Sequence, residues 1–303
     1  MQPDGLNYKI MFTYLIGTLN PKTSDALFRM SINTALGIGT TFALPLPSGR
    51  TYDFLWNPGD GSALRHVTAY NDATATYDYG TPFSGQISIK GKCGGWSFNN
   101  GGDKLKVVSV DQFGDVAIDY LIGGFFGCTN LFNCAPLTGF LGTNLQLAFY
   151  NTPNLVITSD FFTGVGHSLA TMQYCFLNSG ITVFPNMSTL TGLTSIYGIF
   201  TNCLGLNGAT IPENYLLYNI NVTNYREAFA NIRNLILPSV MFNLLALTST
   251  CDFSSFMTIS NIAYSHTGII QDVWNYSPSG AHVNAFLNQT ALTNYAAIPA
   301  DWK

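Results

Sequence analysis

Charged side chains are scarce in this chain of 303 residues, of which only 9% are Asp, Glu, Lys or Arg. Soluble domains usually carry about a quarter of such residues, so the solvated surface must be built from Asn, Thr, Ser, Gly and Tyr. The 12 basic and 16 acidic residues give a formal net charge of -4 and form no basic stripe. Because nucleic-acid binding depends on clustered Lys and Arg that neutralise phosphates, the composition argues against a nucleic-acid partner.

Long hydrophobic runs are also absent, although 47% of the residues are hydrophobic and the mean hydropathy is +0.20. The longest apolar stretch, residues 235–247, is interrupted by Pro238 and Asn243 and is too short to cross a bilayer. The apolar run at residues 10–19 has no basic region before it and no small-residue cleavage site after it, unlike a signal peptide. We therefore expect a folded core, no membrane insertion and no export signal.

Motifs for metals, cofactors and nucleophilic catalysis are missing. The six cysteines include no C-x-x-C pair and no neighbouring His at zinc-finger spacing. The glycines at 37–40 and 123–127 lack the Lys and the spacing of a phosphate-binding loop. The four histidines lie in separate segments without a nucleophile-elbow context, namely His66, His167, His266 and His282. We expect no metal, no cofactor and no catalytic residue.

The closest cluster of carboxylates is Asp111, Asp115 and Asp119. Two of them could form the acid and base pair of a polysaccharide-degrading enzyme. A solvated turn face is favoured instead, because no other catalytic group converges on the cluster. The enzyme stays as an alternative hypothesis.

What is present is a repeated frame over the last two-thirds of the chain, clearest in YREAFANIRNLILP at residues 225–238. A Phe recurs at intervals of 24, 27, 24, 29, 27 and 30 residues, and periods of this length are typical of solenoids. The Phe column consists of Phe125, Phe149, Phe176, Phe200, Phe229, Phe256 and Phe286. Phe176 is followed by Ile181, and the other six are followed six residues later by Leu131, Leu155, Leu206, Leu235, Ile262 and Leu292.

Three further positions share this frame. Four residues before the Phe, five copies have an apolar residue, as expected for two side chains on one face of a helical turn, namely Leu121, Leu145, Met172, Ile196 and Tyr225. Three residues after the Phe, we expect a small buried side chain rather than a disulfide, namely Cys128, Thr152, Ser179 and Cys203. Apolar runs that end at Pro predict short strands at 181–185, 206–212, 235–238 and 292–299.

The segment 27–92, before the repeats, has an all-β pattern. The runs FRMSI, TTFALPL, TYDFLW, TATYDY and QISIK are separated by Gly, Pro, Asn and Asp turns, which predicts five strands in a small sandwich. Residues 1–26 form an N-terminal arm with no clear structure. Residues 93–120 contain one expected strand, 105–110, and fit a capping repeat that joins the sandwich to the solenoid. Cys93 and Cys134 could pair, although their spacing does not require it.

The turn WNPGDGS at 56–62, followed by YDYGTPFSGQISIKG at 77–91, resembles a polycystic-kidney-disease-type (PKD) β-sandwich domain. The matching residues are Trp56, Gly59, Asp60, Gly61 and Tyr79, while Pro58 stands where the family usually has an aromatic residue. Gly59 and Gly61 permit the positive φ of a tight turn, and Asp60 can accept hydrogen bonds from the amides of that turn. No second carboxylate lies close by to complete a calcium site, so a structural role is favoured.

The repeats resemble the BspA-like leucine-rich repeats of bacterial surface proteins, most clearly in FFGCTNL at 125–131 and IFTNCLGL at 199–206. The segment FNNGGDKLKVVSVDQFGDV at 98–116 supports the resemblance, because a PKD-like domain precedes such repeats elsewhere in the family. The resemblance covers about residues 27–303. It implies a mainly β fold with short helical turns, in which a sandwich at 27–92 precedes a leucine-rich-repeat solenoid at 93–303 with about seven repeats after residue 120.

Such proteins usually adhere or bind and do not catalyse, and tyrosines are typical of recognition surfaces. The candidate binding surface comprises Tyr197, Tyr215, Tyr218, Tyr264 and Tyr295. With no export signal, an adhesin-like chain fits best on a virion, above all a phage released by lysis, as a decoration, fibre or host-attachment component. The alternatives are a bacterial cell-surface adhesin and a structural subunit that packs in a shell.

The expected partners are other virion or surface proteins, with a host glycan or receptor as ligand, in an oligomer or larger assembly. The sequence finishes at Trp302 and Lys303 without a recognisable polar cap after the last repeat. Because an uncapped solenoid exposes its core and its last strand edge, we expect another chain to cover the C-terminal end.

Overall fold

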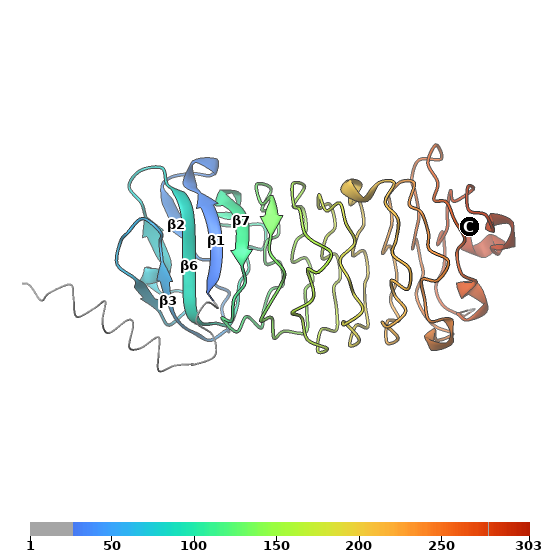
Figure 1. Cartoon of the computed structure of the whole chain (residues 1–303), viewed down its shortest axis with the longest axis horizontal. Coiled ribbons are helices and arrows are strands. Elements are labelled where there is room, and N and C mark those ends of the chain that lie inside the picture. The colour runs from blue at the N-terminus through green and yellow to red at the C-terminus, as the bar shows by residue number, and fades with distance from the viewer. Residues whose placement is uncertain (1–26, 278) are drawn as a thin grey trace, which may run out of the picture.

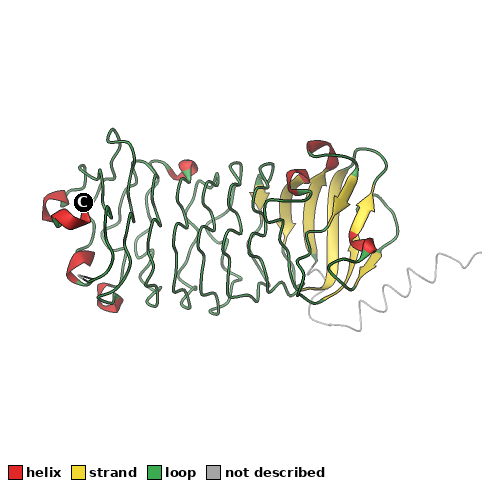
Figure 2. Ribbon diagram, turned by 180° about the vertical axis from the view of Figure 1, so that it is seen from behind, coloured by secondary structure: helices red, strands yellow, loops and turns green. Residues whose placement is uncertain are grey.

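Residues 27–277 and 279–303 are described by the structure, a computed structural model. The expected arm, residues 1–26, lies outside the described residues. Regular strands gather at one end of an elongated molecule, and successive coils of chain are stacked from there along the long axis (Figures 1 and 2). The fold is therefore built from two kinds of β structure, a regular sheet and a stack of irregular coils.

Eight strands and several short helical turns make up the regular structure. One sheet has the order β4-β3-β6-β1-β7-β8, and β2 pairs separately with β5. The strands are β1 Phe28–Asn33, β2 Thr41–Ala43, β3 Tyr52–Asn57, β4 Arg65–Val67, β5 Thr76–Asp78, β6 Ser84–Cys93, β7 Val107–Gln112 and β8 Asn133–Cys134. Within 27–277 and 279–303 the helices are three-residue 3-10 turns, namely η1 Thr34–Leu36, η2 Ala73–Ala75, η3 Lys104–Lys106, η4 Leu204–Leu206, η5 Leu244–Ala246, η6 Val273–Asn275, η7 Tyr295–Ala297 and η8 Ala300–Trp302. The predicted mainly β class is confirmed.

Alternating side chains determine which face of the large sheet is buried. In β1, Phe28, Met30 and Ile32 are buried and the residues between them are partly exposed. The neighbouring strand β6 is antiparallel to both β1 and β3, and it places Ile87 and Ile89 on the same buried face. All five strands expected between residues 27 and 92 are present. Sequence reasoning missed β4, which is only three residues long and has a single buried residue.

The predicted turn at 56–62 fixes the contact between the two sheets. Trp56 is fully buried, donates from Nε1 to the Thr74 carbonyl at 2.9 Å, and meets the ring of Tyr77 edge-on at 6.5 Å. Asp60 accepts a hydrogen bond from the Tyr77 hydroxyl at 2.8 Å. Gly59 has φ +93, and a Cβ there would lie 2.1 Å from the Gln86 carbonyl, so only glycine fits. These residues hold the turn against the sheets.

The large sheet continues into the coils through β7 and β8. Strand β7, expected in the capping repeat, is antiparallel to β1 on one side and parallel to β8 on the other. Asn133 of β8 in turn forms a parallel bridge to Val156 in the next coil. The switch from antiparallel to parallel pairing at β7 therefore starts the stack.

Each coil is hydrogen-bonded in parallel to the coil that follows it. One row of bridges runs through Asn144, Thr171, Ser195, Asn224 and Asp252. A second row joins Thr210, Ile236 and Thr267. No regular strand forms at the predicted positions 181–185, 206–212 and 235–238, where the extended chain makes single bridges at most. The predicted strand at 292–299 is wrong, because this segment turns and contains η7.

The seven members of the Phe column lie fully buried at the centre of the stack. Successive ring centroids are 5.4, 5.5, 6.0, 5.6, 5.3 and 6.3 Å apart. The apolar residues four positions earlier are buried as well. Between each of these apolar residues and the Phe that follows it, the chain makes tight turns, and most copies have a residue at positive φ two positions before the Phe. The expected helical turn is therefore absent. The small residues three positions after the Phe are buried. All six cysteines are free, so Cys93 and Cys134 do not form a disulfide.

One residue of the predicted repeat core is misplaced. Ile262 is 83% exposed, whereas His266 is fully buried. Thr267 pairs with Ile236, so His266 occupies the level of the stack that Leu235 occupies in the preceding coil. Extra residues between Phe256 and His266 loop outward and carry Ile262 to the surface. The repeated frame does not show how many residues are inserted in a loop, so it could not predict that His266 is buried here instead of Ile262.

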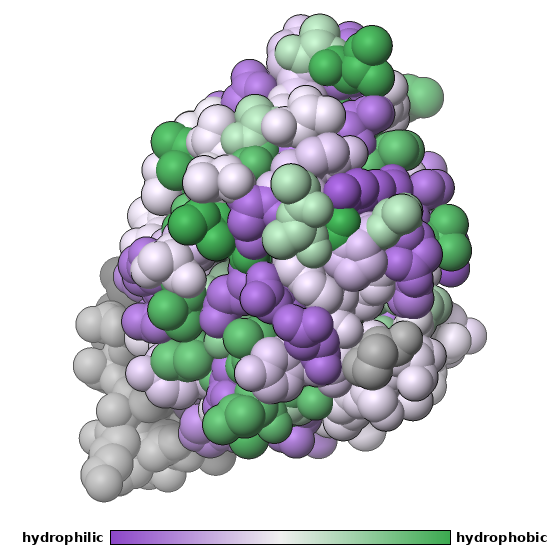
Figure 3. All heavy atoms as spheres, turned by 90° about the vertical axis from the view of Figure 1, so that its right-hand side faces the viewer, coloured by the Kyte–Doolittle hydropathy of each residue, from purple (hydrophilic) through white to green (hydrophobic). Residues whose placement is uncertain are grey.

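The last coil is partly covered by the residues that follow it. Trp302 is buried, its ring lies parallel to that of His282 with centroids 4.5 Å apart, and its carbonyl accepts a hydrogen bond from the Phe286 amide. Viewed from the C-terminal end, polar and apolar side chains are mixed, with no single apolar face (Figure 3). Trp302 thus covers part of the C-terminal end, and the expected covering by another chain stays a prediction.

A buried lysine joins the N-terminal loops to β7. Lys106 is fully buried, and its Nζ donates to the carbonyls of Ile38 at 2.8 Å and Thr41 at 2.6 Å. The same nitrogen lies 2.7 Å from Asp103 Oδ1, and Asp103 Oδ2 accepts a hydrogen bond from the Ala43 amide at 2.8 Å. Every hydrogen of the ammonium group therefore has an oxygen partner.

Replacement of a member of the Phe column should be costly. Phe176→Ala removes a ring that contacts Phe149 and Phe200, and we expect a loss of about 3–5 kcal/mol in the free energy of unfolding. The matched control is Phe132→Ala, since Phe132 is 54% exposed and should lose much less. Urea unfolding followed by circular dichroism measures both, and equal losses would contradict a continuous packed column.

Replacement of the buried lysine should also destabilise the fold. Lys106→Met leaves the Asp103 carboxylate and two carbonyls without their cation, and we expect a loss of about 3 kcal/mol in the free energy of unfolding. Lys92→Met is the control, because Lys92 is exposed, and it should stay within about 0.5 kcal/mol of the unmodified chain. A Lys106→Met protein as stable as this control would show that the three contacts contribute nothing net.

Candidate functional site

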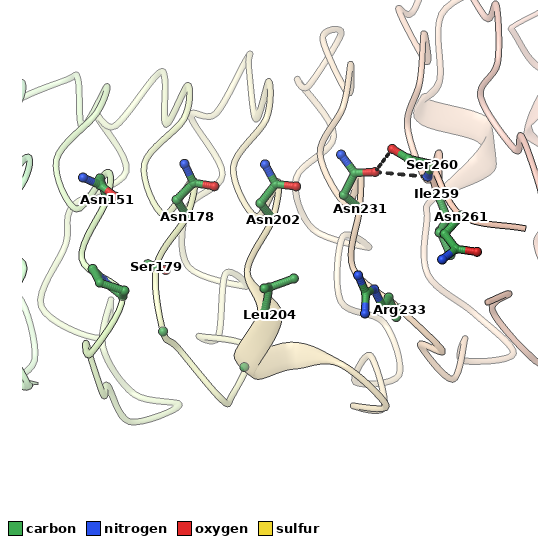
Figure 4. Close-up of a pocket in the computed structure, with 13 residues that line it drawn as sticks. Asn151, Asn178, Ser179, Asn202, Leu204, Asn231, Arg233, Ile259, Ser260 and Asn261 are labelled. Carbon is green, nitrogen blue, oxygen red and sulfur yellow. Dashed lines mark hydrogen bonds between the residues drawn. The ribbon is translucent and has the colours of Figure 1, made fainter. Parts of the chain in front are cut away.

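A groove lined by asparagines crosses several coils of the stack. It has a volume of about 650 Å³, and its lining includes Asn151, Asn178, Asn202 and Asn231. We call these four residues the Asn row and the cavity the Asn groove. Figure 4 shows the Asn row as a line of side chains, one from each of four successive coils. The groove therefore follows the axis of the stack.

The position of the Asn row follows from the turn that holds each buried Phe. Each of the four asparagines lies two residues after a member of the Phe column and has φ between 55 and 59. Its backbone N–H donates to a carbonyl of the next coil, as in Asn178 to Thr201 at 3.0 Å and Asn202 to Ala230 at 3.0 Å. The backbone N–H is thus bonded to the next coil, and the side chain projects from the stack.

Three members of the Asn row have unused hydrogen-bonding capacity. Over residues 27–277 and 279–303, the carboxamides of Asn151, Asn178 and Asn202 make no side-chain hydrogen bond, although all three are only partly exposed. Asn231 differs, because its Oδ1 accepts hydrogen bonds from the Ser260 amide and hydroxyl. Each free carboxamide can donate and accept at the same time.

The charge of the Asn groove is low and positive. No carboxylate is among the residues that line it, and its one charged side chain is Arg233. The Arg233 guanidinium lies 4.4 Å from the ring centroid of Tyr264, which holds it at the end of the Asn row. Leu204, 57% exposed, adds an apolar surface in the middle. The groove therefore suits a ligand rich in hydroxyl groups.

One of the five candidate tyrosines is buried, and the other four are at least partly exposed. Tyr215 is buried, with its ring against Phe184 and Phe200 and its hydroxyl donating to Pro185, so its inclusion was wrong. Tyr218 is 53% exposed. The other three each lie against a cation, with Arg226 near Tyr197, Arg233 near Tyr264 and Lys303 near Tyr295. Of the five, Tyr264 is the one that holds a residue of the Asn groove.

Two residues of the Asp111, Asp115 and Asp119 cluster are used in structural contacts. Asp111 accepts hydrogen bonds from the Ser31 hydroxyl at 2.7 Å and the Gln86 amide at 2.8 Å. Asp119 forms an ion pair with Arg50 at 3.3 Å. Asp115 is exposed on a turn. In the described part of the chain no hydrogen bond connects these three carboxylates, and none of them lines the Asn groove.

The histidines have separate environments. His66 and His282 lie 2.8 and 2.9 Å from the carboxylates of Asp53 and Asp301. Nδ1 of His266 accepts a hydrogen bond from the Leu235 amide at 3.1 Å, while its Nε2 is buried without a partner among the described residues. Burial lowers the pKa of His266 to about 3. No group of three or more His, Cys, Asp or Glu in the described ranges could hold a metal ion.

No helix in the described part of the chain has the length and apolar character needed to cross a membrane. Comparison with protein-family models, with curated proteins and with solved structures found no match to this chain. Its function must therefore be inferred from its own residues and their arrangement.

Sequence reasoning missed the Asn row. The signal was present, since Asn follows four successive members of the Phe column by two residues. The predicted frame includes the apolar positions and the small residue three positions after the Phe, but not this position. That the four side chains lie in one groove, with three of them unpaired, follows only from the register between coils.

The buried histidine should make stability depend on pH. Because the folded-state pKa of His266 lies below its ordinary value of 6.5, the unfolded chain takes up a proton first as the pH falls, and stability is lost from about pH 6.5 toward pH 3. His266→Asn keeps an acceptor near the Leu235 amide and removes the titration. Between pH 7 and pH 5, the unmodified chain should lose about 2 kcal/mol more than the variant. Urea unfolding at both pH values measures this difference, and equal losses would show that His266 is not held neutral.

Proposed function

We propose that this chain is a non-enzymatic, surface-exposed binding protein and a component of a phage particle, where it serves as a decoration, fibre or host-attachment protein. Its stack would present an uncharged surface to a glycan or protein. The alternative is the same binding role on the surface of a bacterial cell.

The fold part of the proposal is a leucine-rich-repeat solenoid of the BspA-like type that follows a PKD-like sandwich. The buried Phe column and the parallel bridges between coils support it. The contact between Trp56 and Tyr77, which brings the two sheets together, supports the sandwich. An elongated stack offers a long lateral surface for its size, which favours binding over catalysis in a closed pocket.

The Asn groove is the observation that carries the binding role. It is a groove of about 650 Å³ with free carboxamides, one arginine and no carboxylate. Glycoside hydrolysis needs two carboxylates on either side of the bond to be cleaved, and this groove supplies none. Of the three carboxylates that motivated the enzyme alternative, Asp111 and Asp119 are bonded to other residues and Asp115 is exposed on a turn. Recognition without turnover is the function this arrangement supports.

The scarcity of charge is compatible with the particle setting, where many copies lie side by side. Dense packing of one protein is disfavoured by a large net charge, because like charges then repel across every contact. A net charge of -4 spread over 303 residues keeps this repulsion small. The same property would serve an adhesin array on a cell, so location must be tested directly.

Antibodies raised against the purified chain provide that test. They should label intact virus particles from the source culture in immunogold electron microscopy and detect the chain in purified particles by immunoblot. The bacterial envelope fraction is the control. Detection only in the envelope fraction would overturn the particle assignment and support the cell-surface adhesin.

A further inference from the structure

The Asn row is more uniform than its backbone conformation requires. Positive φ favours Gly and Asn, and the first member of the Phe column is indeed followed two residues later by Gly127 with φ 76. Two residues before the Phe, however, the same conformation recurs at Leu147, Tyr174 and Glu227 with φ of 58, 54 and 54. This stack therefore tolerates varied side chains at positive φ. Four consecutive asparagines in the Asn row indicate a role for the carboxamide itself.

Asn231 supports the fold through the hydrogen bonds that its Oδ1 accepts from Ser260, but Asn178 and Asn202 do not have this role. Asparagines elsewhere in the stack donate to the preceding coil, as Asn154 does to Thr129 at 2.8 Å and Asn221 to Thr191 at 2.9 Å. Within the described ranges, Asn178 and Asn202 make no such bond. The carboxamide atoms of Asn178 and Asn202 are open to solvent, so a ligand can replace water at both the donor and the acceptor.

The spacing of the Asn row sets the repeat of a matching ligand. Members of the row come from successive coils that are joined by parallel backbone bridges, and bridged strands lie about 4.8 Å apart. This is close to the length of one hexopyranose residue in an extended β-1,4-linked chain. Each carboxamide can accept from one sugar hydroxyl and donate to another. Leu204 offers an apolar contact for the C–H face of a sugar ring.

Other polymers fit less well. A peptide strand pairs with both free N–H and free C=O groups along an edge, but the N–H groups of Asn178 and Asn202 already donate to the next coil, so the groove offers no complete strand edge. A nucleic acid would need several cations, whereas Arg233 is the one charged residue in the lining. The groove thus selects for hydroxyl groups at regular intervals rather than for charge or a strand edge.

The geometry points to the Asn groove as the binding site for a linear, β-1,4-linked polysaccharide that lies along the stack, with one sugar residue per coil. This inference rests on the proposed binding function and specifies its ligand class. Arg233, held by Tyr264 at the end of the row, adds affinity for chains that carry a carboxylate substituent.

The test uses the full chain and two hexasaccharide probes, β-1,4-linked glucose and β-1,4-linked N-acetylglucosamine, in isothermal titration calorimetry. The variant Asn178→Gly/Asn202→Gly removes two carboxamides and keeps the positive φ, so the stack should fold. The matched control is Asn214→Gly/Asn284→Gly, which changes two exposed asparagines with φ 61 and 59 outside the groove. Circular dichroism checks that all three proteins are folded alike.

At least one probe should bind to the unmodified chain and the control, and the Asn178→Gly/Asn202→Gly variant should bind it about tenfold or more weakly. In NMR spectra, the side-chain amide signals of Asn178 and Asn202 should shift when that probe is added. An α-1,6-linked glucose hexasaccharide, whose linkage does not give an extended chain, should bind less.

Absence of binding by both β-1,4-linked probes at millimolar concentration would overturn the inference, as would equal affinity of the groove variant and the control. Either result leaves the particle assignment standing, because antibody labelling decides that separately. Binding that is lost in the groove variant, with no label on particles, would support the groove and overturn the particle assignment.

Discussion

Parallel hydrogen bonding between successive coils is the constraint on which the rest of the structure depends. Each coil of the stack must present its backbone groups at the height and register of the coil before it, as the amides of Phe149, Phe176 and Phe200 do toward the following coil. A backbone path that repeats in this way places equivalent side chains directly above one another. The Phe column, the small buried residues three positions after the Phe and the Asn row are three consequences of one register.

This register also explains why so few residues are charged. A charge at a repeated position would face its own copy one coil away, at about the spacing of the Phe rings, 5.5 Å for Phe149 and Phe176. Two like charges at such a distance repel by about 1 kcal/mol even in water, and the penalty recurs in every coil. Neutral amides and hydroxyls avoid it and can hydrogen-bond along the row. The few cations of the stack instead lie against tyrosine rings, as Arg226 and Arg233 do.

Variation in length is confined to the loops where the register does not apply. The segment between Phe256 and Phe286 is the longest of the series, and its extra residues leave the core at Ile262. His266 takes the buried position predicted for Ile262, and its Nδ1 accepts a hydrogen bond from the Leu235 amide. A polar ring in an apolar column is tolerated there because burial holds it neutral, and its pKa is lowered to about 3.

The sequence by itself determined the mainly β class, the five strands between residues 27 and 92, and the identity of the buried column, because hydrophobic spacing records which residues must leave water. Only the tertiary structure decided that Tyr215 is in the core, that β7 joins the sheet of β1, and that Trp302 covers Phe286. It also decided that four asparagines share one groove with three carboxamides unpaired. Spacing along the chain specifies which residues are equivalent, but the register between coils and the lengths of the loops determine which of them meet in space.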